Sequence, residues 1–178
     1  MKQKGLIIRS LFDFKEKKLI IGLFTAFLVF ISDQFSKQFI MHFLLENGAP
    51  FKVNPYFNIV EAFNKGVSFS MFDNGGLLGC IMLILLALGV VGFLLWWLKD
   101  EPSRFVQICL GFIIGGALGN VYDRLSIGAV YDFLDFHIKA YHWPVFNVAD
   151  SFICIGAFLI ICHTILNRKK ISLKEITK

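Results

Sequence analysis

Residues 76–98, GLLGCIMLILLALGVVGFLLWWL, decide the fold because they form an apolar run with no charged residue. A helix rises 1.5 Å per residue, so about 20 apolar residues cross the hydrocarbon core of a bilayer. Runs of similar length at about 19–44, 105–125 and 145–166 predict three more spans. We therefore expect one integral membrane domain over residues 1–178, of the all-α class, with four transmembrane helices.

Composition and charge support this membrane class. The chain is 56% hydrophobic and 17% charged, whereas soluble domains are about 45–50% apolar and about 25% charged. A net charge of +5 would fit a nucleic-acid binder, but the basic residues flank the apolar runs, as positive-inside topology requires. The clusters are Lys2, Lys4, Arg9, Lys15, Lys17 and Lys18, then Lys99 and Arg104, then Arg168, Lys169, Lys170, Lys174 and Lys178.

The basic clusters also predict the topology. Four spans place both termini on one side, and the positive clusters identify that side as cytoplasmic. The longer linkers at 46–75 and 126–144 then face outward. Alternating residues over 53–63 predict one or more short strands, so the segment of about 46–75 is expected to be a small extracytoplasmic unit containing β structure.

Ionisable residues interrupt the apolar runs, although a charge at bilayer depth costs about 2.5–3.5 kcal/mol. Asp33 and Lys37 are spaced i, i+4 in the first run and can pair on one helix face. Asp123 and Arg124 end the third run, and Asp150 lies near the start of the fourth. All of them fall in the outer third of the predicted spans. Two interpretations are compatible with this pattern. The charged residues pair and orient a helix, or they line a polar cleft.

Two further motifs carry residues suited to turns or close packing. Asn64 and Gly66 lie within 64–69, NKGVSF, which predicts either a simple turn or an Asn amide that binds an extended peptide. The run 115–120, GGALGN, is a small-residue face for helix packing or for the approach of a substrate helix. Asn120, Asp123 and Arg124 continue this run at i, i+3 and i+4 and therefore share a face.

Asp132 and Asp150 form the pair of greatest chemical interest. One follows the third span and the other opens the fourth, so antiparallel packing brings them together at the outer interface. Two adjacent carboxylates do not both ionise readily, which leaves one to take a proton from water and one to donate a proton. This division of labour suits peptide hydrolysis without a metal or a covalent intermediate. A proton or ion relay and a purely structural role are the alternatives.

Two other function classes have weaker support. Asp135, His137 and His142 do not have a recognised zinc-ligand spacing, and the four cysteines lie within apolar runs, so we predict no metal site and no cofactor. A small transporter would carry its polar groups near the midplane of the membrane. Here the polar groups gather toward one face.

Taken together, the motifs resemble the bacterial lipoprotein signal peptidase family, signal peptidase II. The resemblance extends over nearly the whole chain, and its pieces occur in order on a four-span frame. They are 33–37 DQFSK, 64–69 NKGVSF, 115–124 GGALGNVYDR, 130–133 VYDF and 146–150 FNVAD.

The resemblance implies a membrane-embedded aspartic endopeptidase that cleaves the signal peptide of a prolipoprotein just before a cysteine carrying diacylglycerol. It assigns Asp132 and Asp150 as the catalytic pair. We also expect a monomer in the bacterial inner membrane among membrane lipids, with no nucleic-acid partner and an active site near the extracytoplasmic face. The residues that match substrate-binding or supporting positions are Asp33, Lys37, Asn64, Gly66, Gly116, Asn120, Asp123, Arg124 and Asn147.

Overall fold

Four helices form the body of the protein in a computed structural model that describes residues 2–66 and 76–176, with side chains described over 19–66 and 76–167. The helices are α1 (Lys2–Asn47), α2 (Gly76–Asp100), α3 (Arg104–Ile127) and α4 (Val148–Ile176). Within the described residues, four stretches are long and apolar enough to cross a membrane: Leu19–Asn47, Gly76–Asp100, Arg104–Ile127 and Val148–Asn167. The four predicted spans are thus confirmed, and α1 continues through the basic N-terminal stretch.

A small antiparallel sheet joins the two longer linkers. Its strands are β1 (Phe51–Asn54), β2 (Phe57–Asn64), β3 (Val130–Ile138) and β4 (Tyr141–His142), in the spatial order β1-β2-β3-β4. The strands predicted after the first span are confirmed. Strands β3 and β4, which follow the third span, were not predicted. Strand β3 runs beside β2, with Phe63 opposite Tyr131 and Ala62 opposite Asp132.

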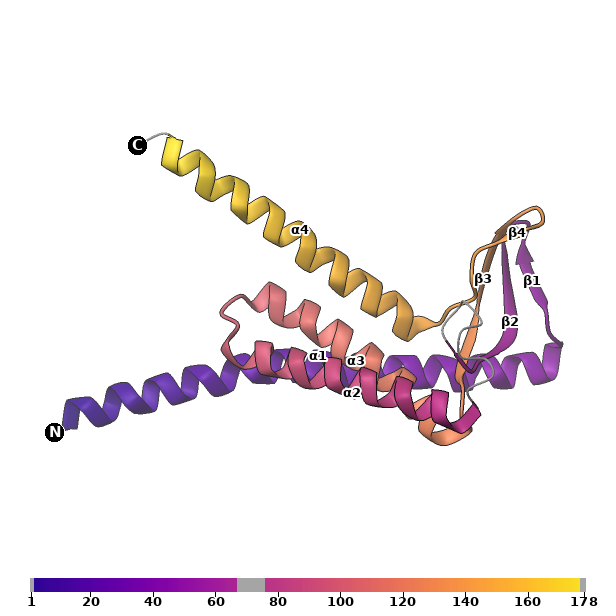
Figure 1. Ribbon diagram of the computed structural model, residues 1–178, viewed down its shortest axis with the longest axis horizontal. Coiled ribbons are helices and arrows are strands. Elements are labelled where there is room, and N and C mark those ends of the chain that lie inside the picture. Colours follow the sequence, from indigo (N-terminus) through magenta and orange to yellow (C-terminus); the bar gives the residue numbers. More distant parts are fainter. Residues whose placement is uncertain (1, 67–75, 177–178) are drawn as a thin grey trace.

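The sheet lies at one end of the helices, and both chain termini lie at the other (Figure 1). Helix α3 is central because its glycines allow close contact on two sides. A Cβ at Gly115 would lie 2.4 Å from the Ala26 carbonyl oxygen of α1, and one at Gly116 would lie 2.5 Å from the Ala149 carbonyl oxygen of α4. The small-residue face therefore packs helices together.

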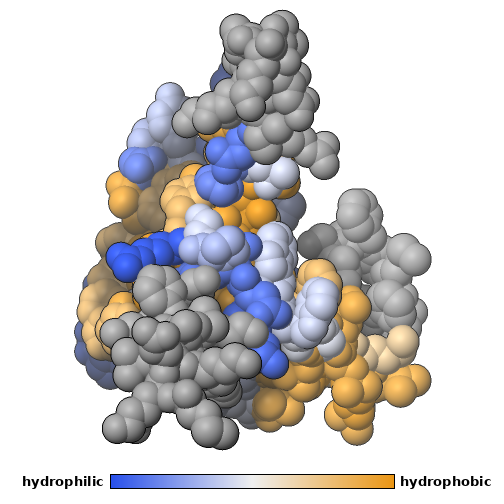
Figure 2. All heavy atoms as spheres, turned by 90° about the vertical axis from the view of Figure 1, so that its left-hand side faces the viewer, coloured by the Kyte–Doolittle hydropathy of each residue, from blue (hydrophilic) through white to orange (hydrophobic). Residues whose placement is uncertain are grey.

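The core is small and the apolar outer surface is large, as expected when lipid is the solvent. Leu98, Leu110 and Ile114 are almost fully buried, whereas Phe24 and Phe158 are exposed by 60% and 65%. Figure 2 looks onto the end that carries both termini and shows hydrophilic residues near its centre, with hydrophobic residues along its flanks. At this end, polar groups thus lie toward the middle of the bundle and apolar groups toward its outside.

Candidate active site

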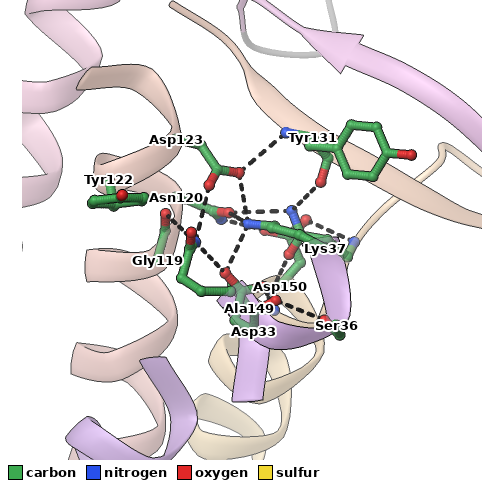
Figure 3. Close-up of polar contacts among 12 residues, drawn as sticks. Asp33, Ser36, Lys37, Gly119, Asn120, Tyr122, Asp123, Tyr131, Ala149 and Asp150 are labelled. Carbon is green, nitrogen blue, oxygen red and sulfur yellow. Dashed lines mark hydrogen bonds and ion pairs between the residues drawn. The ribbon is translucent and has the colours of Figure 1, made fainter. Parts of the chain in front are cut away.

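The sequence-predicted polar residues meet where α1, α3 and α4 reach the sheet (Figure 3). Helix α1 supplies Asp33 and Lys37, and α3 supplies Asn120 and Asp123. Strand β3 and the start of α4 add their own members, Asp132, Asn147 and Asp150. The buried members of this cluster are Asp33, Lys37, Asp123, Asp132 and Asn147. Residues more than 100 positions apart in sequence are thus in direct contact.

Asp132 lies on β3 with its carboxylate buried, at 2% exposure. Its Oδ1 accepts a hydrogen bond from Asn147 Nδ2 at 2.7 Å, and its Oδ2 accepts one from Asn64 Nδ2 at 3.2 Å. Burial, and then the nearby carboxylate of Asp150, raise the pKa of Asp132 to about 6, against the lowering effect of the two amide hydrogen bonds. Asp132 therefore keeps its proton to a higher pH than an ordinary aspartate.

Asp150 is fixed by the first turn of α4. Its backbone N–H donates to Asn147 Oδ1 at 2.9 Å, and its Oδ2 accepts the Asn147 N–H at 3.3 Å. This reciprocal pair is a capping box in which Asn147 caps the helix and Asp150 answers three residues later. The second oxygen, Oδ1, accepts Asn120 Nδ2 at 2.7 Å. The cap also explains why α4 begins at Val148 and not at the predicted residue 145.

Asn147 links the two aspartates. Its side-chain oxygen receives the Asp150 N–H, while its Nδ2 donates to Asp132 Oδ1 and also to Asn120 Oδ1 at 3.1 Å. The Asp150 carboxylate lies close enough to contribute to the raised pKa of Asp132. The predicted pair is therefore brought together in one polar cluster, and a single asparagine contacts both members.

An ion-pair brace of Asp33, Lys37 and Asp123 lies beside this pair. Lys37 Nζ is 2.8 Å from Asp33 Oδ2 and 2.7 Å from Asp123 Oδ2, and it donates to Asn120 Oδ1 at 3.2 Å. An ammonium group has three donors, so each proton of Lys37 has a partner. The predicted i, i+4 pairing of Asp33 with Lys37 is confirmed, and Asp123 completes the brace from α3.

Each carboxylate of the brace also holds a backbone N–H. Asp33 Oδ1 accepts the N–H of Ala149 at 2.9 Å, and Asp123 Oδ2 accepts the N–H of Tyr131 at 3.1 Å. Ala149 directly precedes Asp150, and Tyr131 directly precedes Asp132. The brace therefore fixes the backbone next to both aspartates. These two contacts leave no sequence signal, because any residue except proline supplies a backbone N–H.

The other predicted residues have more peripheral positions. Asn64 Oδ1 accepts the N–H of Gly66, so its side chain turns the backbone and holds Asp132 at the same time. Gly116 contacts α4 through its backbone. Arg124 donates to the carbonyl of Asn120 and lines a cavity of about 480 Å³ together with Lys65 and Cys80. The remaining lining residues are Gly76, Leu77, Leu125, Ile127 and Gly128.

Asp135 and His142 lie apart from this cluster, on the far part of the sheet. Asp135 accepts hydrogen bonds from Asn58 Nδ2 at 2.9 Å and contacts His142 Nδ1 at 2.7 Å. Burial raises the pKa of Asp135, but the contacts with His142 and Asn58 outweigh it and hold that pKa below its ordinary value. In the described part of the chain, no three His, Cys, Asp or Glu side chains form a metal-ligand group.

Comparison with known proteins gives this cluster its context. A model of the family described as signal peptidase (SPase) II matches residues 25–166. The chain belongs to the signal peptidase II family. All five motifs behind the predicted resemblance fall within the matched residues, so that prediction is confirmed. As a member of this family, the chain is a protease with several spans in the bacterial inner membrane.

Individual relatives are similar to this chain over most of their length. The lipoprotein signal peptidase of Aeromonas hydrophila is 43% identical over 159 residues, which cover 87% of this chain and 92% of the relative. That of Coxiella burnetii is 42% identical, with 85% and 94% covered. Two bacterial membrane enzymes solved at 2.3 Å and 1.9 Å resolution are each 28% identical and have TM-scores of 0.70 and 0.66. The first covers 84% of this chain and 90% of its own; the second covers 80% and 91%.

Proposed function

We propose that the protein is an aspartic endopeptidase that removes the signal peptide from diacylglyceryl-modified prolipoproteins, cutting just before the lipidated cysteine. Asp132 and Asp150 activate the attacking water. The observation that carries this proposal is the convergence of the two carboxylates on Asn147, whose Nδ2 donates to Asp132 Oδ1 at 2.7 Å and whose backbone N–H donates to Asp150 Oδ2 at 3.3 Å. The relatives named lipoprotein signal peptidase support the choice of substrate.

The two aspartates have different surroundings, which suggests different roles. Asp132 is buried and has a raised pKa of about 6, so it holds the proton and donates it to the carbonyl oxygen of the scissile bond. Asp150 lies at the N-terminal end of α4, where the helix dipole stabilises negative charge, and it accepts a proton from water. When the tetrahedral intermediate collapses, Asp150 delivers the proton taken from water to the departing amine, and Asp132 recovers its own proton from the hydroxyl group at the cleaved carbonyl, as general acid–base catalysis requires.

The surroundings of the pair fit a lipidated peptide. The cavity beside Arg124 combines polar and apolar groups at the sheet end of the bundle, where the peptide leaves the hydrocarbon core. The other residues of this cluster hold the site in place and take no part in the reaction. The enzyme acts as a monomer with no cofactor, the sheet end of the bundle faces away from the cytoplasm, and both termini are cytoplasmic. The basic clusters that flank the spans support this orientation.

The decisive experiment is cleavage of a diacylglyceryl-modified precursor by purified protein in detergent. Asp132→Asn and Asp150→Asn should each abolish cleavage while leaving the protein folded. Asp135→Asn is the matched control, because Asp135 lies on the same strand but contacts Asn58 and His142. Full activity in either active-site variant would overturn the assignment. A chelator should leave the rate unchanged, and loss of activity that a divalent metal restores would contradict the cofactor-free mechanism.

A further inference from the structure

Gln34 lies inside the brace. Its side-chain nitrogen Nε2 is 2.9 Å from Asp123 Oδ1, 3.1 Å from Asp33 Oδ2 and 3.3 Å from the Gly119 carbonyl oxygen. Those contacts join α1 to α3 at the level of the candidate pair. Lys37 is the charged link between the two carboxylates, and Gln34 is the neutral one.

The contacts of Asp123 show where Gln34 acts. Asp123 uses Oδ2 for Lys37 and for the N–H of Tyr131, and it uses Oδ1 for Gln34. The amide of Gln34 therefore fixes the rotation of the carboxylate plane. When that plane is fixed, Oδ2 stays directed at the backbone next to Asp132.

We propose that Gln34 is a positioning residue for the reaction. It orients Asp123, which in turn holds β3 at Tyr131 and so sets where the Asp132 carboxylate lies relative to Asp150. This inference rests on the proposed function, since it assigns the route by which one member of the catalytic pair is held. Gln34 itself touches neither Asp132 nor Asp150 through any of its three hydrogen bonds.

The charges around Gln34 explain why a neutral donor suits this position. Two carboxylates, Asp33 and Asp123, share the single ammonium group of Lys37. A second ammonium would compete with Lys37 for the same oxygens, and a carboxylate would repel both aspartates at short range. An amide donates to both aspartates without changing the charge balance of the cluster.

The test compares Gln34→Ala with Gln38→Ala in the precursor cleavage assay. Gln38 lies one helical turn further along α1, with an exposed side chain. We expect Gln34→Ala to lower kcat about 10-fold to 100-fold, because small displacements of reacting groups cost up to about that much. KM should change less than about twofold, since the substrate-binding surface is intact, and Gln38→Ala should match the wild type. Gln34→Glu should be at least as damaging as Gln34→Ala.

A pH profile separates positioning from loss of folded enzyme. The charged groups that act on Asp132 are Asp150 on α4, Lys37 on α1 and Arg124 on α3. If β3 loosens at Tyr131, Asp132 moves away from Asp150, and the alkaline limb of the kcat/KM profile should shift to lower pH in Gln34→Ala. Gln34→Met, which keeps the side-chain length, gives the same comparison if the alanine variant does not fold.

Two results would overturn the inference. One is an unchanged kcat in Gln34→Ala, and the other is a lower kcat with the alkaline limb at its wild-type pH, which indicates only a smaller active fraction. These outcomes are distinct from failure of the proposed function. That function fails if either Asp132→Asn or Asp150→Asn remains fully active, whatever Gln34→Ala does.

Discussion

Asn147 reaches across from the cap of α4 to strand β3, and its Nδ2 lies 2.7 Å from Asp132 Oδ1. The same side chain caps the helix that carries Asp150. One amide side chain therefore contacts both aspartates.

Replacing Asn147 by alanine should consequently cost far more activity than stability. Loss of a helix cap destabilises a protein by about 1 kcal/mol, whereas misplacement of a reacting group lowers the rate about 100-fold. Denaturant unfolding in detergent and steady-state cleavage measure the two effects. Asn167→Ala, in the exposed last turn of the same span, is the control. A loss of activity no larger than the loss of folded protein would contradict the bridging role.

Lys37→Met should strongly destabilise the protein. It removes the cation shared by Asp33 and Asp123, which are both buried, and breaking one partner out of a buried ion pair costs about 3–5 kcal/mol. The free energy of unfolding measures this, and Lys52→Met, at an exposed position of β1, should leave it nearly unchanged. A loss below about 1 kcal/mol would show that the brace is dispensable.

Gly119→Ala should disturb the brace by steric contact. A Cβ at this position would lie 2.5 Å from Asp33 Oδ2, whereas a Cβ at Gly89 would meet nothing within 4 Å. Overpacking of this kind costs about 1–3 kcal/mol, and here it also displaces the carboxylate that holds Ala149. We expect lower stability and slower cleavage for Gly119→Ala, and wild-type behaviour for Gly89→Ala. Equal behaviour of the two variants would rule out the close approach.

The pH dependence follows from the raised pKa of Asp132, about 6. Proton binding by Asp132 stabilises the folded protein. This stabilisation is fully present below the unfolded pKa of about 3.9 and is lost as pH rises through the folded pKa. In the proposed mechanism Asp132 must hold its proton, so we expect activity to follow the same sign. We expect kcat/KM to fall with an alkaline limb near pH 6 in the free enzyme, and Asp135→Asn to leave this limb in place. A flat profile between pH 5 and 8 would contradict the assigned proton.

The sequence predicts the spans well because bilayer thickness imposes a length on each apolar run. It also places Asp33 and Lys37 on one face, since helical spacing is regular. Strand β3 escapes detection for a physical reason. Val130 to Phe133 are all buried, so the period-two alternation that reveals a half-buried strand is absent. A short apolar run that contains two aspartates is therefore interpreted as a linker.

The brace shows a second limit of prediction from the sequence. The i, i+4 spacing predicts that Asp33 pairs with Lys37, but nothing in the spacing indicates that Asp123 joins them or that Ala149 and Tyr131 supply N–H groups. Such contacts depend on how three helices and a strand pack. Gln34 likewise lies inside a predicted motif, but the sequence predicts no hydrogen-bond partner for it, because its acceptors come from both α1 and α3.

The pairing of Lys37 with a residue of its own helix has a consequence for biogenesis. Segment Leu19–Asn47 emerges from the ribosome long before α3 exists, and a solitary ammonium would oppose its transfer into lipid. Asp33, one turn away at 2.8 Å, lets the first span enter the bilayer as a self-neutralised unit. Asp123 lies on α3, which follows later in the chain, so its ion pair with Lys37 can form only after α3 has been synthesised.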